Sequence, residues 1–238
     1  LNAAFSGGGA DLILVGGADF KQIIDVYTQL TGRPPLLPRW AFGLWVTSYP
    51  QEKQARVEEI AEQHRQHEIP LDAIILDYHW EEKFHNFRWR PSLFNDPAAM
   101  VSRLKSHGIR TGLIFTPFVN KRNDWLKKVA LQALVGNVTP GEFRADERPL
   151  DLYAQGVKNG YFAHPNATWW FGGGGMIDFT NPAARAWWDG LLKPLYDQGV
   201  AFFKNDDGEY LPEDARTHNG MGGSQANNTY GFYYSRAI

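Results

Sequence analysis

Ionisable side chains crowd together directly after an apolar run that ends at residue 203. A lysine and three acids lie within six consecutive positions, in the order Lys204, Asp206, Asp207 and Glu209. Because successive side chains alternate across a strand, we expect Lys204 and Asp206 on one face. A neighbouring lysine favours the ionised carboxylate and lowers its pKa, as a carboxylate nucleophile requires. The sequence therefore predicts Asp206 as a nucleophile supported by Lys204 and Glu209, with a surface cluster of salt bridges as the alternative.

A second acid, Asp77, ends another apolar run, residues 73–76. It precedes Tyr78, His79 and Trp80, so we expect a carboxylate beside aromatic rings and an imidazole. Ligand-binding groups of parallel α/β folds gather at the carboxyl ends of the strands, which favours a substrate-binding role here. A helix cap or a solvated loop acid is the alternative interpretation of Asp77 alone.

Metal binding is the competing chemistry for these acids. Asp77, Asp206, Asp207 and Glu209 can offer oxygen ligands to a divalent cation, but the Asp-Asp-Gly-Glu run lacks the alternate spacing of an EF-hand loop. The chain has no cysteine and no HExxH motif, and its glycine clusters lack the spacing of phosphate-binding loops. We predict no metal and no cofactor.

Strands and helices alternate from Trp40 onward, the pattern typical of βα units around a parallel sheet. We expect strands at 41–46, 73–76, 111–115 and 200–203, helices at 52–67, 97–108 and from Asn181, and a last helix beginning at Thr229. Before them come an expected strand at 12–15 and a helix at 19–30. Residues 118–177 are too many for a simple βα loop and predict a lid or subdomain. This alternation fits either half of an eightfold barrel or a small doubly wound sheet.

The composition restricts the class of partner. A formal charge of −2 over 238 residues offers no electrostatic footprint for nucleic acid or an anionic membrane, and no long apolar run suggests a membrane span. We expect a water-soluble protein, either cytoplasmic or secreted or periplasmic. Aromatic residues make up 14% of the chain, with nine tryptophans, which suits either ligand stacking or an aromatic-rich core.

Several segments together resemble glycoside hydrolase family 31, the retaining α-glycosidases. The resemblance runs in order through residues 27–43, 72–80, 87–97, 178–182 and 203–209. It implies a (β/α)8 TIM barrel, preceded by a β-sandwich, of which about the first four βα units are present. Residues 1–38 would then be the end of the sandwich domain and a linker, and residues 39–238 the N-terminal half of the barrel, with the insertion at about 118–177.

The resemblance also implies roles for single residues. Asp206 matches the nucleophile, Asp77 matches an aspartate that hydrogen-bonds sugar hydroxyls, and Trp170 and Ile114 match residues that line the same subsite. Further substrate-binding residues are expected at Tyr78, Trp80 and Asp207. Two departures concern the substrate, because Asp207 stands where many members have phenylalanine or methionine, and Trp170 is followed by Phe-Gly rather than Pro-Gly. The acid/base aspartate of the family is expected beyond Ile238, so no residue is assigned that role.

The predicted function is hydrolysis of non-reducing-end α-glycosides through a covalent glycosyl-enzyme intermediate. A non-catalytic carbohydrate-binding protein and an α-transglycosylase stay open as alternatives. The predicted partners are an α-linked oligosaccharide or glycoside and the remainder of the same enzyme, since the chain is expected to be a fragment; a homo-oligomer stays open. Glucoside, xyloside, galactoside and N-acetylgalactosaminide are all compatible with these residues.

Overall fold

The computed structural model of the chain describes residues 12–48, 53–83, 85–122, 151–169 and 172–238. These residues form two compact units, divided between Phe42 and Gly43, and each is described by itself. Among the described residues, no helix is both long enough and apolar enough to cross a bilayer.

The first unit contains helix α1 (Phe20–Thr31) and the short 3-10 helix η1 (Arg39–Phe42). Asp19 caps α1 by accepting a hydrogen bond from the backbone N–H of Gln22, at 2.8 Å. The strand predicted at 12–15 is wrong, because these residues are irregular and Leu12 and Leu14 are more than four-fifths exposed. The predicted start of the first barrel strand is also wrong, because the chain turns at η1 where a strand was expected.

The second unit is built on a four-stranded parallel sheet in the order β1-β2-β3-β7. Its strands are β1 (Trp45–Thr47), β2 (Ala73–Leu76), β3 (Arg110–Phe115) and β7 (Phe202–Asn205). The pairing runs in register from Thr47 through Ile75 and Gly112 to Phe202. Sequential βα units with all strands parallel confirm the α/β class, and the sheet is part of a TIM barrel.

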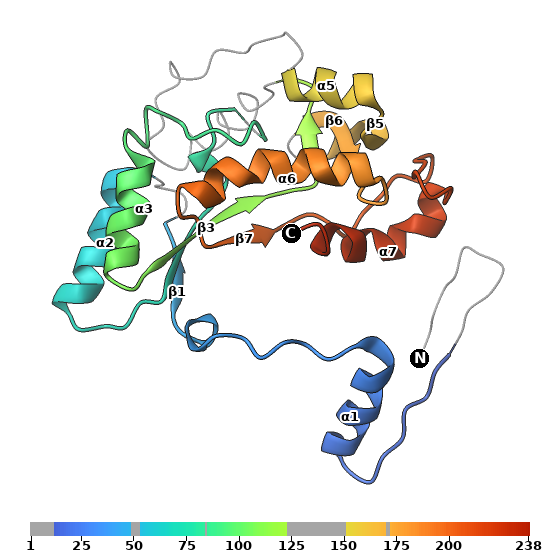
Figure 1. Cartoon of the computed structure of the whole chain (residues 1–238), viewed down its shortest axis with the longest axis horizontal. Helices are drawn as coiled ribbons and strands as arrows, with labels where there is room; N and C mark the ends of the chain where they lie inside the picture. The colour runs from blue at the N-terminus through green and yellow to red at the C-terminus, as the bar shows by residue number, and fades with distance from the viewer. Residues whose placement is uncertain (1–11, 49–52, 84, 123–150, 170–171) are drawn as a thin grey trace. The chain divides into compact units, whose positions relative to one another are not determined.

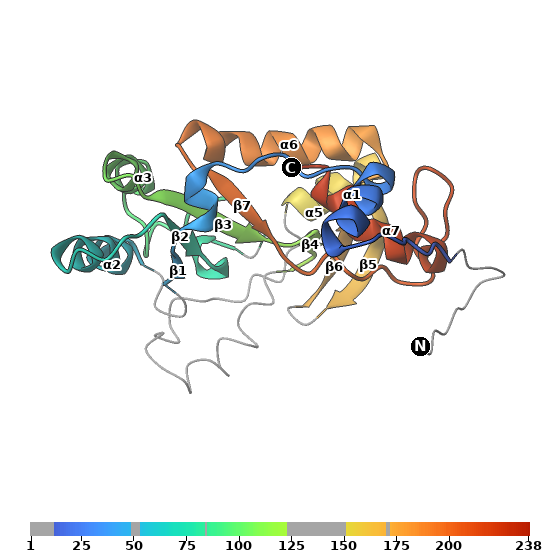
Figure 2. The same ribbon diagram turned by 90° about the horizontal axis from the view of Figure 1, so that it is seen from below.

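Amphipathic helices cover one face of this sheet. They are α2 (Gln54–Gln66), α3 (Pro97–Ser106) and α6 (Pro182–Asp197), and α2 and α3 lie side by side in both views (Figures 1 and 2). Helix α3 begins as its sequence predicts, with Asp96 accepting from the Ala99 N–H and Pro97 in the first turn. The core between these helices and the sheet includes Val57, Ile74, Leu76, Met100, Leu104, Leu113 and Leu195.

The opposite face of the sheet is concave. The rings of Trp45 in β1 and Phe202 in β7 lie 4.6 Å apart between centroids, although these are the two outer strands of the sheet. In a flat sheet the two backbones would be roughly 14 Å apart, so the sheet curls until the side chains of its outer strands meet. Gly112 makes room beneath, because a Cβ there would lie 2.3 Å from the Phe202 ring. The aromatic rings of Trp45 and Phe202 therefore lie on the concave face.

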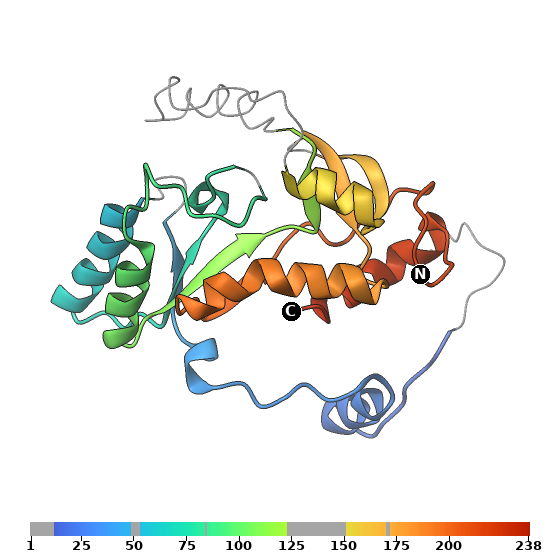
Figure 3. The same cartoon turned by 45° about the horizontal axis from the view of Figure 1, so that its top comes forward.

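The described part of the predicted insertion forms a separate antiparallel sheet in the order β4-β6-β5. Its elements are β4 (Phe118–Asn120), α5 (Asp151–Asn159), β5 (Phe162–Trp169) and β6 (Gly172–Ile177). Figure 3 shows α5 against this sheet, at the end of the unit opposite α2 and α3. The last helix, α7 (Gly223–Ser235), begins earlier than its predicted start at Thr229. Together α6, α7 and the antiparallel sheet enclose a second core that contains Phe115, Phe179, Trp188, Tyr230 and Tyr234.

Candidate active site

The predicted site residues of β2, β3 and β7 share the concave face. Ile114 pairs with Lys204 in the register of β3 and β7. Leu76 pairs with Leu113, so Asp77, one residue past the end of β2, stands level with Ile114. Because side chains alternate along a strand, Asp206 lies on the same face as Lys204, two residues further on. The sheet register therefore brings Asp77 and the Lys204–Asp206 segment to the same edge.

Lys204 and Asp206 form an ion pair in the structure. The Lys204 Nζ lies 3.5 Å from Asp206 Oδ2, and the two side chains are 46% and 42% exposed. Such partial exposure leaves room for a ligand while keeping a cation beside the carboxylate. Strand alternation predicts this shared face, and the geometry agrees with it.

Asp77 has a different environment. It is half-buried, and burial raises the pKa of its carboxyl above the usual range. Three interactions oppose this rise in pKa: the 2.9 Å hydrogen bond that its Oδ1 accepts from the Tyr78 N–H, and the charges of Lys204 and His79. The negative charge of Asp206 raises the pKa further. The two carboxylates and the lysine therefore act on one another electrostatically.

The chain turns sharply after the predicted nucleophile. Asp207 has a φ of +54°, in the left-handed region that non-glycine residues seldom adopt, and it is half-buried. Glu209, predicted to support the nucleophile, is exposed. After the turn the chain becomes exposed at Glu209, whereas Asp207 is half-buried.

Trp80, predicted to bind substrate, has no exposed side-chain surface in the structure. The 3-10 helix η2 (Tyr78–Trp80) turns the indole into the core, where it has no exposed surface and packs edge-on against Trp89. Its Nε1 donates to the carbonyl of Ile114 at 3.0 Å, so Trp80 supports the sheet from beneath. Tyr78 is half-buried, and Ile114, which is level with Asp77 and Lys204, is 4% exposed. Trp170 lies outside the described residues.

A polar network near this edge has no counterpart in the sequence predictions. The fully buried Glu81 accepts hydrogen bonds from the N–H groups of His85 and Phe87, at 2.8 and 3.0 Å. Burial raises the pKa of Glu81 to about 8, although those N–H groups and the charge of Arg90 oppose the rise. His85 Nε2 lies 2.9 Å from the hydroxyl of Thr116, directly past the end of β3. No sequence motif marks Glu81, because its partners are backbone N–H groups, which residues of almost any type would supply.

Two buried tyrosines of α7 were also absent from the predictions. Tyr230 and Tyr234 are one helical turn apart, and each hydroxyl donates to a strand-end carbonyl, that of Ile177 and that of Phe115. Their spacing of four residues is the only sequence signal, and it indicates one face of a helix. Within the described ranges, no three histidine, aspartate or glutamate side chains are grouped so that they could hold a metal ion.

Most of the chain matches a known protein family and known proteins. The model of the Glycosyl hydrolases family 31 TIM-barrel domain matches residues 34–238. The α-xylosidase XylQ of Lactiplantibacillus pentosus is 31% identical over 226 residues, which cover 92% of this chain and 26% of XylQ. An isomaltosyltransferase of Sporosarcina globispora is 27% identical, with 95% of this chain and 22% of the transferase covered.

The fold of the chain resembles that of a solved enzyme structure. The cycloalternan-degrading enzyme from Trueperella pyogenes, in complex with a covalent intermediate, matches with a TM-score of 0.72 at 25% identity. The match covers 91% of this chain and 31% of that enzyme. The chain therefore spans between about a fifth and a third of the length of these three relatives.

Proposed function

Because the chain belongs to glycoside hydrolase family 31, we propose that it supplies the nucleophile half of a retaining α-glycosidase site. The observation that carries the proposal is the Lys204–Asp206 ion pair on the concave face, level with Asp77 at the same edge of the sheet. A carboxylate held beside a cation, on a face that is partly open, is suited to attack a sugar carbon.

In the proposed first step, an Asp206 oxygen attacks the anomeric carbon of a non-reducing-end α-glycoside. The bond from that carbon to the leaving oxygen breaks, and this oxygen takes a proton from a second carboxyl group, to which no residue of the chain is assigned. The product is a covalent glycosyl ester of Asp206. In the second step water attacks the same carbon, the second carboxylate takes its proton, and Asp206 is released, so two inversions retain the configuration.

Lys204 and Asp77 have separate roles in this scheme. Lys204 places a positive charge beside Asp206, which offsets the charge change when the ester forms and breaks. Asp77 accepts hydrogen bonds from sugar hydroxyls, which orients the anomeric carbon toward Asp206. Charged acceptors make stronger hydrogen bonds than neutral ones, and Asp77 faces the same space as the ion pair.

The relatives support an α-linked substrate. One is an α-xylosidase, and the cycloalternan-degrading enzyme was solved with a covalent intermediate, as expected for a carboxylate nucleophile. Since the chain spans only about a quarter of XylQ, we propose that the complete site also needs residues from the remainder of the same enzyme. The domain limits predicted from the sequence, 1–38, 39–238 and the insertion at about 118–177, belong to this proposal.

Transglycosylation is the second candidate, and the likeness to an isomaltosyltransferase favours it. The same covalent intermediate would then pass its glycosyl group to a sugar hydroxyl instead of water. Product analysis at rising acceptor concentration separates the two: hydrolysis yields free sugar throughout, and a transferase yields longer oligosaccharides.

The test of the proposed function is to trap the intermediate in the full-length protein. A fluorinated α-glycosyl fluoride, whose fluorine substituent slows breakdown of the ester, should add one glycosyl mass to the protein. Peptide mass spectrometry should place that mass on Asp206. A label on Asp77, or no label while a non-fluorinated aryl α-glycoside is turned over, would overturn the assignment.

A further inference from the structure

We propose that Tyr234, on α7, is a positioning residue that holds the main chain of Asp206 in place for attack. The inference rests on the proposed function, because it gives the tyrosine a role only if Asp206 is the nucleophile. Tyr234 does not reach the substrate in this proposal, and it acts through the ends of β3 and β7.

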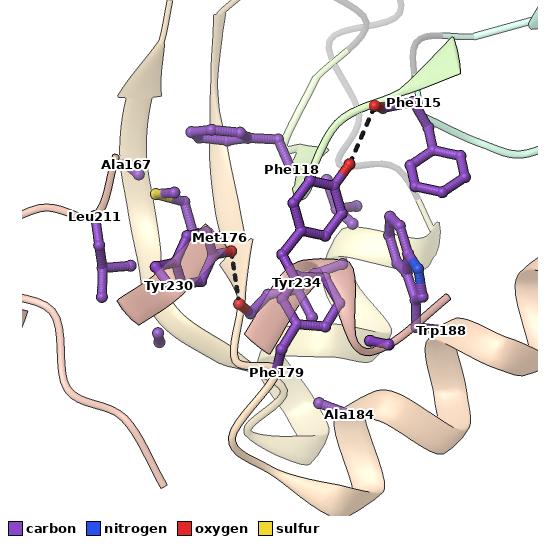
Figure 4. Packing of buried hydrophobic residues seen from close by; sticks show 14 of the residues in the cluster. Phe115, Phe118, Ala167, Met176, Phe179, Ala184, Trp188, Leu211, Tyr230 and Tyr234 are labelled. Carbon is purple, nitrogen blue, oxygen red and sulfur yellow. Dashed lines mark hydrogen bonds between the residues drawn. The ribbon is translucent and has the colours of Figure 1, made fainter. Parts of the chain in front are cut away.

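The central contact is a carbonyl shared by two donors. The carbonyl of Phe115, the last residue of β3, accepts the backbone N–H of Asp206 at 3.0 Å. The same oxygen accepts the hydroxyl of Tyr234 at 3.1 Å (Figure 4). One oxygen atom therefore joins β3, the nucleophile's backbone and α7.

The turn behind Asp206 is pressed against the same tyrosine. A Cβ on Gly208 would lie 2.4 Å from Cδ1 of the Tyr234 ring, so only glycine lets the ring sit there. On α7, a Cβ on Gly231 would lie 3.2 Å from the Gly208 carbonyl oxygen, which shows how closely the helix approaches the turn. Asp207, which lies between Asp206 and Gly208 in the sequence, has a φ of +54°. The left-handed turn that ends β7 is thus packed against α7.

Tyr234 is itself held firmly. It is 2% exposed, and its ring stacks on Phe179 with centroids 5.1 Å apart. Burial raises the pKa of its hydroxyl well above the usual range, so the group stays protonated and remains a donor. A rigid donor on a packed helix can fix a strand end more tightly than the turn can by itself.

Attack on an anomeric carbon depends steeply on position, and a displacement of about 1 Å can cost roughly 100-fold in rate. The Asp206 side chain has only two rotatable bonds, so its carboxylate follows its main chain. The competing interpretation is that Tyr234 is an ordinary buried tyrosine that contributes only to stability.

The chain offers a matched control for that interpretation. Tyr230 lies on the same helix, is also 2% exposed, and its hydroxyl donates to the carbonyl of Ile177 at 2.8 Å (Figure 4). Its carbonyl partner belongs to β6, so removing this hydroxyl takes a comparable hydrogen bond from α7 without touching the Phe115–Asp206 bond.

The experiment compares Tyr234→Phe with Tyr230→Phe in the full-length protein. Both variants should lower the melting temperature by similar amounts. Tyr234→Phe should reduce kcat on an aryl α-glycoside, and the rate of labelling by the fluorinated glycosyl fluoride, by roughly 10- to 100-fold with little change in KM. Tyr230→Phe should leave both rates close to wild type. Gly208→Ala, which forces the ring and the turn apart, should reproduce the kinetic loss.

The outcomes separate the two proposals. If wild-type label appears on Asp206 and both tyrosine variants are labelled at the same rate, the positioning role of Tyr234 is wrong and the proposed function stands. If wild-type protein is active but carries no label on Asp206, the proposed function is wrong and the positioning role falls with it.

Discussion

Two strand ends of one sheet each lead to an aspartate, and the two aspartates differ in chemistry. The apolar strand β2 leads directly to Asp77, whereas β7 passes through Lys204 and Asn205 before Asp206, and both acids belong to one edge of the sheet. Burial raises the pKa of Asp77, whereas Asp206 is 42% exposed and paired with Lys204. Two aspartates at one edge of a sheet therefore need not have the same environment.

The backbone after each acid accounts for part of the difference. Asp77 accepts the N–H of Tyr78 and leads into the 3-10 helix η2, which turns Trp80 into the core. Asp206 leads into the left-handed turn at Asp207, which packs against α7. Asp77 is half-buried and caps a helical turn, and the side chain of Asp206 is 42% exposed beside a cation. We expect an orienting role for Asp77 and a nucleophilic role for Asp206.

The largest effect should come from Asp206→Ala. Removing a nucleophile from a catalytic unit costs roughly 10⁴-fold or more in kcat, so turnover of an unactivated α-glycoside should almost cease. Added azide should enter the vacated space and restore turnover of an activated glycoside, giving a glycosyl azide of inverted configuration. NMR of the product checks this. Wild-type turnover in Asp206→Ala would show that the two acids have been assigned to the wrong roles.

Asp77→Asn should have the next largest effect. The asparagine oxygen can still accept the Tyr78 N–H, so the fold should persist while the charged acceptor for sugar hydroxyls is lost. A hydrogen bond to a charged group is worth about 1.5–3 kcal/mol, which predicts roughly a 10- to 150-fold lower kcat/KM. Azide should not rescue this variant.

The pH profile sharpens the assignment of Asp77. Its carboxylate must be ionised to accept hydroxyls, and its pKa is raised, so kcat/KM should fall with decreasing pH at a higher pH than an ordinary aspartate gives. Asp77→Asn should remove this acid limb. An unchanged limb in the variant would assign it to another group.

A smaller effect is expected from Lys204→Met. Because both partners of the ion pair are more than a third exposed, solvent screens their attraction, and we expect roughly a 2- to 5-fold loss in kcat. Lys204→Arg keeps the charge and should retain most of the activity. If the two variants lose equal activity, shape rather than charge at residue 204 supports Asp206.

Glu81→Gln should have the smallest effect on kcat and a distinct effect on stability. The folded pKa of Glu81, about 8, lies above the value of about 4.3 for an unfolded glutamate. The folded state therefore binds more protons between these values, and this contribution is fully present below pH 4.3 and is lost as pH rises through 8. Denaturant titrations should show wild-type stability falling over that range, with a weaker dependence in Glu81→Gln. Equal slopes would contradict the raised pKa.

Sequence patterns predicted most of the helices and strands of the second unit, residues 43–238, and the acids that follow its strands. The helix at Asp96–Pro97 and the apolar run 73–76 agree with the structure because caps and buried strands leave local signals. The strand at 12–15 was wrong, since an apolar run predicts a strand only where a partner strand is present to pair with it. No sequence signal indicated that Trp80 would be fully buried, because the direction of a side chain in a short helical turn depends on the core beneath it.

By itself, the sequence determined the class of fold, the order of the βα units and the sharing of a face by Lys204 and Asp206, because alternation and capping are local. The tertiary structure decided how far each acid is buried and that Lys204 lies beside Asp206, and it alone brought the hydroxyl of Tyr234 to the carbonyl that also holds Asp206. Those contacts join residues as much as 119 positions apart, and no local pattern records where the folded chain will place them.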